Sequence, residues 1–215
     1  MGEQHRGTGI PPEFARRPLR TITARQAAAI YPHPRQQLSR LADRGLLHRP
    51  ADGYYVVVPQ EHVGSVWLPE LEAVAAGIGA AIYGPDQAML MGVSAARALG
   101  VIPRALAVGV VAVPKQRAPI RLRDRDATIR FVTRDTDRLD AETIGTELGR
   151  AVVTTPEQTV LDLAHRPTLG DTEIEVPTAI RALYRRCDPQ RLAELAADQR
   201  LGTALDRATA LATQS

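Results

Sequence analysis

Cysteine, lysine and long apolar runs are all scarce in this chain of 215 residues. Its one cysteine, Cys187, excludes a disulfide within the chain and any zinc site built from several cysteines. The longest apolar run, residues 105–113, is far shorter than the roughly 20 residues that span a bilayer. The first residues also lack the apolar segment of a secretory signal. We therefore expect a cytoplasmic protein that has no membrane partner.

Motifs of the common catalytic sites are missing as well. The chain has no phosphate-binding G-x-x-x-x-G-K-[ST] motif, and its one lysine, Lys115, follows a proline. It has neither the H-E-x-x-H motif of zinc peptidases nor the G-x-S-x-G motif of serine hydrolases. The five histidines are scattered along the chain. The sequence therefore predicts a protein that is not an enzyme, with no catalytic residues, no cofactor and no metal site.

One dense acidic stretch keeps a metal-dependent nucleic-acid enzyme open as an alternative. Its carboxylates are Asp124, Asp126, Asp135, Asp137 and Asp140. Two carboxylates on one turn could hold a divalent cation. These aspartates are interleaved with arginines, however, and a nuclease would be expected to place a lysine beside its carboxylates. The pattern favours an exposed hairpin that is held by ion pairs.

The net charge of +3 is unevenly distributed along the chain. Residues 1–63 contain nine arginines and five acidic residues, so they carry a net charge of +4, whereas the remaining residues carry −1. Between Arg16 and Arg49 there are eight arginines and one acid, Asp43. A small segment with this bias is typical of a surface that binds a polyanion such as DNA. An arginine-rich surface that only faces solvent would show the same bias, so charge alone does not decide between the two.

The order of local signals over residues 21–63 predicts a winged helix-turn-helix domain. Thr23 can cap a helix that reaches about Ile30, and the prolines of the next turn end that helix. Pro34 then suits the first turn of a second helix, and Gly45 suits its left-handed end. The β-rich segment that follows surrounds a Gly turn, which predicts a hairpin in the position of a wing.

The second of these helices has the composition expected of a DNA-recognition helix. Leu38 and Leu41 share one face, which must be buried. The opposite face carries glutamine, serine and arginine, whose donors and acceptors can read base edges in a major groove. Arg49, at the hairpin turn, could lie along the phosphate backbone or in the minor groove. The residues predicted to contact DNA are Arg25, His33, Arg35, Gln36, Gln37, Ser39, Arg40, Arg44 and Arg49.

The rest of the chain predicts a mixed α/β domain with a helical C-terminal tail, so the fold class is α+β. A helix with small residues on one face is expected from Leu68 to about Ile82, and a second helical segment over residues 84–100. Several β-rich segments follow. Residues 173–213 are almost continuously helical in pattern, with a break near Pro189.

A capping box opens the helix that follows the β-rich segments. Thr155 stands at the cap and Gln158 at the third helical position. Glu157 lies near the positive end of this helix, where a carboxylate is stabilising without any catalytic role. Asp162 is expected to hold an arginine inside the fold. Both acidic residues are therefore interpreted as structural.

Three segments together resemble the AbiEi antitoxins. Residues 21–57 are similar to the N-terminal winged helix of that family. The segment "GVSAARALG", residues 92–100, resembles its Ser-Ala-Ala segment before a leucine and a glycine. The segment "VVTTPEQTVLDLAH", residues 152–165, resembles its strand, Thr-Pro-Glu and helix segment. The resemblance extends from about residue 21 to about residue 200.

This resemblance implies two partners. AbiEi antitoxins repress their own operon through the winged helix and neutralise a co-encoded nucleotidyltransferase-like toxin through the C-terminal domain. We accordingly expect a flexible arm over residues 1–20, a winged helix-turn-helix DNA-binding domain over 21–63 and a C-terminal antitoxin domain over 64–215. The operator or promoter DNA and the toxin are the expected partners. We expect a monomer or a weak dimer, which could bind DNA cooperatively.

The helical tail is the segment that we expect to contact the toxin. Arg185, Arg186 and Arg191 could meet an acidic surface and steer association. The alternative is that the tail closes the domain core and that these arginines are only solvated. For the whole chain, the second functional hypothesis is a winged-helix transcriptional regulator whose C-terminal domain senses a small ligand.

Overall fold

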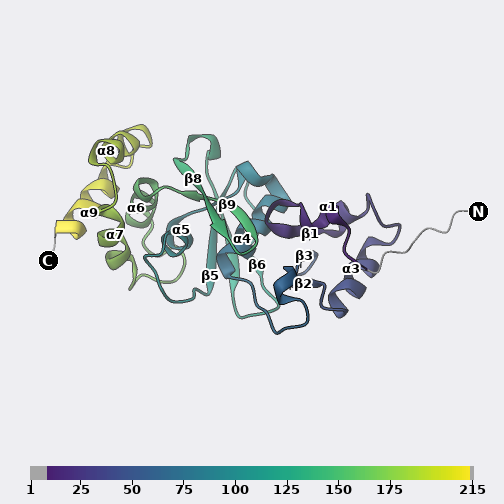
Figure 1. Cartoon of the computed structure of the whole chain (residues 1–215). Helices are drawn as coiled ribbons and strands as arrows, with labels where there is room; N and C mark the ends of the chain where they lie inside the picture. Colours follow the sequence, from purple (N-terminus) through teal and green to yellow (C-terminus); the bar gives the residue numbers. More distant parts are fainter. Residues whose placement is uncertain (1–8, 214–215) are drawn as a thin grey trace, which may run out of the picture.

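A computed structural model describes residues 9–213, and its N-terminal part has the element order of a winged helix-turn-helix domain (Figure 1). The elements are α1 (Pro12–Ala15), the 3₁₀ turn η1 (Pro18–Arg20), β1 (Thr21–Thr23), α2 (Ala24–Ala27), α3 (Pro34–Asp43), β2 (Leu47–Ala51) and β3 (Tyr54–Val57). The strands form an antiparallel sheet in the order β1-β3-β2, so the hairpin of β2 and β3 occupies the position of the wing. This part of the predicted fold class is confirmed.

Local signals explain where the two helices of this motif begin and end. The Thr23 side chain accepts a hydrogen bond from the Gln26 amide, and the Gln26 side chain accepts one from the Thr23 amide. α2 is shorter than predicted and ends at Ala27, after which a hydrogen-bonded turn replaces the last helical turn. α3 begins at Pro34, as predicted, and is followed by Gly45, whose φ of +69° is the left-handed conformation that favours glycine.

The expectation of a flexible arm over residues 1–20 is wrong for residues 9–20, while residues 1–8 lie outside the described part. Phe14 of α1 is 1% exposed and packs in the core of the winged helix. Leu19 of η1 is buried in the main core of the molecule. Two large apolar side chains are thus removed from water, which fixes this segment to the fold.

The larger part of the chain forms a six-stranded mixed sheet with helices on both faces. Its elements are η2 (Gln60–His62), α4 (Leu71–Tyr83), η3 (Pro85–Gln87), β4 (Met89–Leu90), α5 (Gly92–Ala98), β5 (Val108–Val113), β6 (Ile120–Arg121), β7 (Thr128–Thr133), η4 (Thr136–Arg138), β8 (Ala141–Thr146), β9 (Gly149–Thr154), α6 (Pro156–His165), α7 (Val176–Tyr184), α8 (Pro189–Asp198) and α9 (Gly202–Thr213). The strand order is β6-β7-β5-β4-β9-β8. β5 is parallel to β7 and β4 is parallel to β9, while the other neighbouring strands are antiparallel. The predicted mixed domain with a helical tail is confirmed.

The molecule is elongated, with the winged helix at one end and the helical tail at the other (Figure 1). α4 packs against both β1 and the large sheet, so it lies between the two sheets. α5 and α6 cover the opposite face of the large sheet, and α7, α8 and α9 pack on α6. Among residues 9–213, no helix is both long and apolar enough to cross a membrane.

Two segments differ from the sequence-based prediction. Residues 84–100 do not form one helical segment. Gly84 has a φ of +99° and ends α4, the short strand β4 follows, and α5 begins only at Gly92. Strand β8 had no prediction, because its sequence, AETIGT, is polar and it pairs only with β9 at the edge of the sheet.

Small residues on α4 allow the two sheets to approach this helix closely. A Cβ atom on Gly77 would lie 2.2 Å from Thr21 Oγ1 of the small sheet. A Cβ on Gly79 would lie 2.9 Å from the Cβ of Ala88, next to the large sheet. On the facing strand β5, a Cβ on Gly109 would lie 3.0 Å from the Cβ of Ala75. The predicted face of small residues is therefore a packing surface on both sides of the helix.

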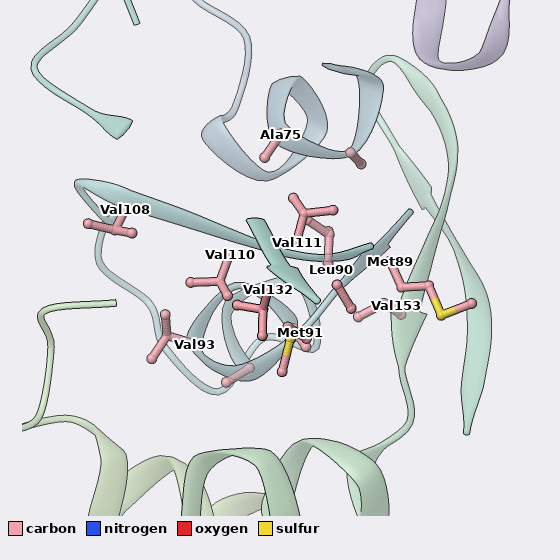
Figure 2. Packing of buried hydrophobic residues seen from close by; sticks show 14 of the residues in the cluster. Ala75, Met89, Leu90, Met91, Val93, Val108, Val110, Val111, Val132 and Val153 are labelled. Carbon is pink, nitrogen blue, oxygen red and sulfur yellow. The ribbon is translucent and has the colours of Figure 1, made fainter. Parts of the chain in front are cut away.

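The central strand β5 is buried on both faces, which explains its unbroken apolar sequence. Val111 points toward Ala75 of α4, while Val110 points to the other side of the sheet, where Val93 of α5 lies (Figure 2). Ser94 of α5 is completely buried, and its hydroxyl oxygen accepts a hydrogen bond of 2.8 Å from the Val110 amide. The main core is thus continuous from α4 through the sheet to α5.

The Gly77→Ala substitution should destabilise the protein. The added methyl group would overlap the Thr21 hydroxyl, which donates a buried hydrogen bond to the Leu19 carbonyl oxygen. Overpacking of this kind lowers the free energy of unfolding by about 1–3 kcal/mol, measurable by urea unfolding. Gly202→Ala is the matched control, since Gly202 opens α9 with no atom near its Cβ position and should be neutral or slightly stabilising. Equal effects of the two substitutions would contradict this account of α4.

Candidate nucleic-acid interface

The exposed face of α3 carries most of the groups that the sequence predicts to contact DNA. Leu38 and Leu41 are buried, as predicted. The exposed side chains among the predicted residues are those of Arg25, His33, Arg35, Gln36, Ser39, Arg40, Arg44 and Arg49, and Gln37 is half-buried. Asp43 is exposed on the same helix, so one carboxylate lies among the cations. The face presents both hydrogen-bond donors and acceptors to solvent.

The N-terminal ends of α2 and α3 enclose a hollow of about 590 Å³. Arg25, His33, Arg35 and Gln36 line it together with alanine and proline side chains. His33 stands at the cap position of α3, but its side chain makes no capping hydrogen bond. The amides of the first helical turn are therefore not satisfied by a cap, and such amides favour an anion such as a phosphate group. Predicted residues from both helices thus converge at one anion-compatible place.

The wing is held to the C-terminal domain by a shared carboxylate. Asp52 Oδ1 accepts hydrogen bonds from Arg49 at 2.8 Å and from Arg123, which follows β6, at 2.6 Å. The Arg123 amide also donates to the Pro50 carbonyl oxygen at 2.8 Å. The hydrogen bond and charge of Arg123, followed by those of Arg49, lower the pKa of Asp52. The Arg49 guanidinium also lies over the Tyr55 ring. Because Arg49 is already paired with Asp52, a phosphate group would have to replace Asp52 as its partner.

A second contact joins the wing to the same hairpin of the C-terminal domain. His48 Nε2 of β2 lies 2.6 Å from Asp124 Oδ2, and Arg125 donates to both carboxylate oxygens of Asp124 at 3.0 and 3.1 Å. The Asp124 side chain is only 7% exposed. Burial acts to raise its pKa, but the hydrogen bonds from His48 and Arg125 outweigh burial and lower it. The sequence did not reveal these contacts, because the partners are far apart along the chain.

Three further aspartates of the acidic stretch have separate partners. Asp126 pairs with Arg121 at 3.3 Å on the surface, as the prediction of an ion-paired hairpin requires. Asp137 accepts a hydrogen bond from Gln87, and Asp140 pairs with an arginine of α8. Within the described range 9–213, no three histidine, cysteine or acidic side chains are grouped to hold a metal ion.

Two of the three arginines predicted to contact a partner protein have structural roles. Arg191 of α8 donates to both oxygens of Asp140, which anchors the tail to the start of β8. Arg186 donates to the Leu99 carbonyl oxygen at 2.9 Å. Arg185 is exposed, and its side chain makes no hydrogen bond or ion pair with residues 9–213. For Arg186 and Arg191, the alternative that the tail closes the domain core fits the contacts better.

The predicted capping box of α6 forms only in part. The Thr155 hydroxyl accepts a hydrogen bond from the Gln158 amide, but the Gln158 side chain points to Gln199 and Asp162 instead of back to the cap. Asp162 is buried and binds Arg134 at 2.8 Å, so the prediction that it holds an arginine internally is confirmed. Burial raises the pKa of Asp162, although the charge of Arg134 opposes this shift.

Two comparisons identify relatives of this chain. The model of the family described as "AbiEi antitoxin C-terminal domain" matches residues 87–213. The crystal structure of the RV2827C protein from Mycobacterium tuberculosis is similar, with a TM-score of 0.58 and 19% sequence identity, covering 89% of this chain and 71% of that chain. This second likeness concerns the fold. No curated protein matches the chain.

The Asp124→Asn substitution should weaken the attachment of the wing. The loss of a buried carboxylate that accepts charged hydrogen bonds should lower the free energy of unfolding at pH 7 by about 1–3 kcal/mol. Because the pKa of Asp124 is lower in the folded state, its contribution is present above about pH 4 and is lost as the pH falls through the folded-state pKa. The difference between the wild type and the variant should therefore shrink below about pH 4.

Asp126→Asn is the matched control for this substitution. Asp126 lies in the same turn, is 96% exposed and pairs with the exposed Arg121. Its removal should change the free energy of unfolding by less than about 0.5 kcal/mol. Urea unfolding of both variants at pH 7 and pH 3 makes the comparison. A loss in Asp124→Asn no larger than in Asp126→Asn would show that the wing is not held by this contact.

Proposed function

Because this chain belongs to the family of the AbiEi antitoxin C-terminal domain, we propose that it is the antitoxin of a toxin–antitoxin pair. In this proposal it neutralises a co-encoded nucleotidyltransferase-like toxin and represses its own operon by binding promoter DNA. Neither role requires catalysis by this chain. Both partners would be met in the cytoplasm. The family match over residues 87–213 is the observation that carries the antitoxin role.

DNA binding is proposed for the winged helix on independent grounds. The segment from Arg16 to Arg49 is strongly basic, and α3 directs glutamine, serine and arginine side chains outward from a buried leucine face. Such a helix can read base edges while nearby cations and helix amides contact phosphates. In this arrangement Gln36 and Arg40 read bases. Arg25, Arg35 and the hollow between α2 and α3 contact the backbone.

The wing has a secondary role in this proposal. Arg49 is already paired with Asp52, so a phosphate gains less from it than from an unpaired arginine. The packing of the small sheet on α4 also fixes the orientation of α3 relative to the antitoxin domain. Two copies of the chain, bound as separate monomers or as a weak dimer, could occupy adjacent half-sites.

The Arg40→Ala substitution should weaken specific promoter binding by about 1–3 kcal/mol and reduce discrimination against random DNA. Arg49→Ala should weaken binding to both DNAs equally and reduce the salt dependence of binding, because it removes a phosphate contact. Arg185→Ala, at the far end of the molecule, is the control and should change neither. Fluorescence anisotropy of the full chain on upstream DNA and on scrambled DNA, at two salt concentrations, measures these effects. Equal losses on both DNAs for Arg40→Ala would contradict the groove assignment.

Toxin neutralisation should survive the loss of DNA binding. A full chain carrying Arg35→Ala and Arg40→Ala should still restore growth when it is expressed with the toxin from an unrelated promoter. The full chain is needed because one face of the small sheet, including Ala51, Tyr54 and Val56, is buried in the main core. Arg185→Glu should reduce rescue if the tail contacts an acidic surface of the toxin. Loss of rescue in the first variant, at equal protein level, would place neutralisation in the winged helix instead.

A further inference from the structure

The antitoxin domain contains a hollow of about 580 Å³ that none of the roles above uses. Three chain segments meet there: the connection from β7 to β8, the C-terminal end of α6 and the turn between α8 and α9. These segments lie toward the end of the molecule opposite the winged helix (Figure 1). Its basic side chains are Arg134, Arg138, His165, Arg166 and Arg200. Its volume lies within the range of small-molecule sites.

The arginines of this hollow differ in how firmly they are held. Arg134 is fixed from behind, because it donates to the buried Asp162 at 2.8 Å and to Gln199 at 2.9 Å. By contrast, Arg166 and Arg200 make no side-chain hydrogen bond or ion pair with any residue of the described range. Within the described residues, two arginines without side-chain partners thus line the same hollow as a third that is already held in place. Such an arrangement suits an anion with several oxygen atoms.

The backbone of Arg200 gives an independent reason to look for a ligand. Arg200 has a φ of +57° at the end of α8, where the Leu201 amide bonds back to the Ala196 carbonyl oxygen at 2.7 Å. This is the left-handed position at which helices usually place glycine. A bulky side chain is disfavoured there, and such strain is characteristic of functional positions. Glycine would satisfy the turn without this strain, so the turn itself does not require arginine.

Helix ends alone do not explain the cluster. Arginine and histidine near a helix C-terminus are stabilised by its partial negative charge. That effect accounts for the positive charge of His165 and Arg166 at the end of α6 and of Arg200 at the end of α8. It does not account for the meeting of these two helix ends with Arg134 and Arg138 of the β7–β8 connection. The hollow also contains Asp135 and Asp198, and the buried side chains of Leu139 and Leu201. It therefore offers cations, carboxylates and an apolar surface together.

The geometry points to a binding site for a nucleoside di- or triphosphate. Arg134, Arg166 and Arg200 would bind the phosphate groups through guanidinium hydrogen bonds. The carboxylates of Asp135 and Asp198 can accept hydrogen bonds from ribose hydroxyls, and the leucines can contact a base. The inference concerns binding only, and it does not depend on the role of α3 or on the identity of the toxin.

Isothermal titration of the full chain tests this site. The probes are ATP, GTP, CTP and UTP, each titrated separately, with sodium tripolyphosphate as the comparison. We expect saturable binding of at least one nucleotide with one site per chain, and binding of tripolyphosphate at least tenfold weaker. Absence of saturable binding at millimolar nucleotide would overturn the proposal. Equal affinity for tripolyphosphate would overturn the nucleoside part of it.

Two variants separate ligand binding from folding. Arg200→Gly removes a guanidinium but relaxes the backbone, so its Tm should equal or exceed that of the wild type while nucleotide affinity falls at least fivefold. Arg166→Gln should lower affinity by a similar factor. Arg185→Gln, an exposed arginine outside the hollow, is the control and should bind as the wild type does. Wild-type affinity in Arg200→Gly and Arg166→Gln, or an equal loss in Arg185→Gln, would contradict the site.

Discussion

The close approach of two sheets to the single helix α4 is the constraint on which the rest of this structure depends. A helix of ordinary composition would hold the sheets apart, because side chains on both of its faces would need space. Gly77 toward the small sheet and Gly79 toward the large sheet remove that space requirement. Around these glycines, Leu71, Val74 and Ile78 of the same helix are buried in the main core that both sheets share. Its almost complete burial follows from this position.

This packing makes the winged helix and the antitoxin domain one body. The small sheet has two buried faces, one against α2 and α3 and one against α4, so α3 cannot turn independently of the large sheet. The pairs of Asp52 with Arg123 and of His48 with Asp124 add polar contacts between the wing and the C-terminal domain. Any partner that displaces the hairpin between β6 and β7 would therefore also loosen the wing.

The sequence predicted those features that depend on neighbours along the chain. The cap at Thr23, the start of α3 at Pro34 and the burial of Leu38 all follow from local geometry and periodicity. It could not predict features that depend on distant partners. Gln158 has the spacing of a capping box, yet its side chain bonds to Gln199 and Asp162 in the folded chain, because Gln158 and Asp162 are buried and need hydrogen-bond partners.

The same limit applies to the candidate sites. Exposed residues of α3 could be assigned from the sequence, because one helix carries them all. Arg186 and Arg191 were assigned to a partner surface, but their partners lie in other segments of the chain itself. The cationic hollow could not be seen at all, since its arginines come from positions between 134 and 200. The positive φ of Arg200 has no signature in the sequence, where glycine would be expected.

In the segments that resemble the AbiEi family, the contacts of the motif residues stabilise the fold and do not form a binding surface. Ser94 satisfies a strand amide, Thr155 caps α6, and Asp162 holds Arg134. A buried carboxylate with an arginine partner is costly to break, so a residue with this role constrains the sequence without touching any ligand. Arg134 belongs both to the buried hydrogen-bond network and to the lining of the hollow. Its guanidinium stabilises the buried network, and its position also brings it to the hollow that Arg166 and Arg200 line. The residues that select a partner are thus expected on the surface, around the buried contacts that the family segments form. Related chains could share these buried contacts and still bind different molecules.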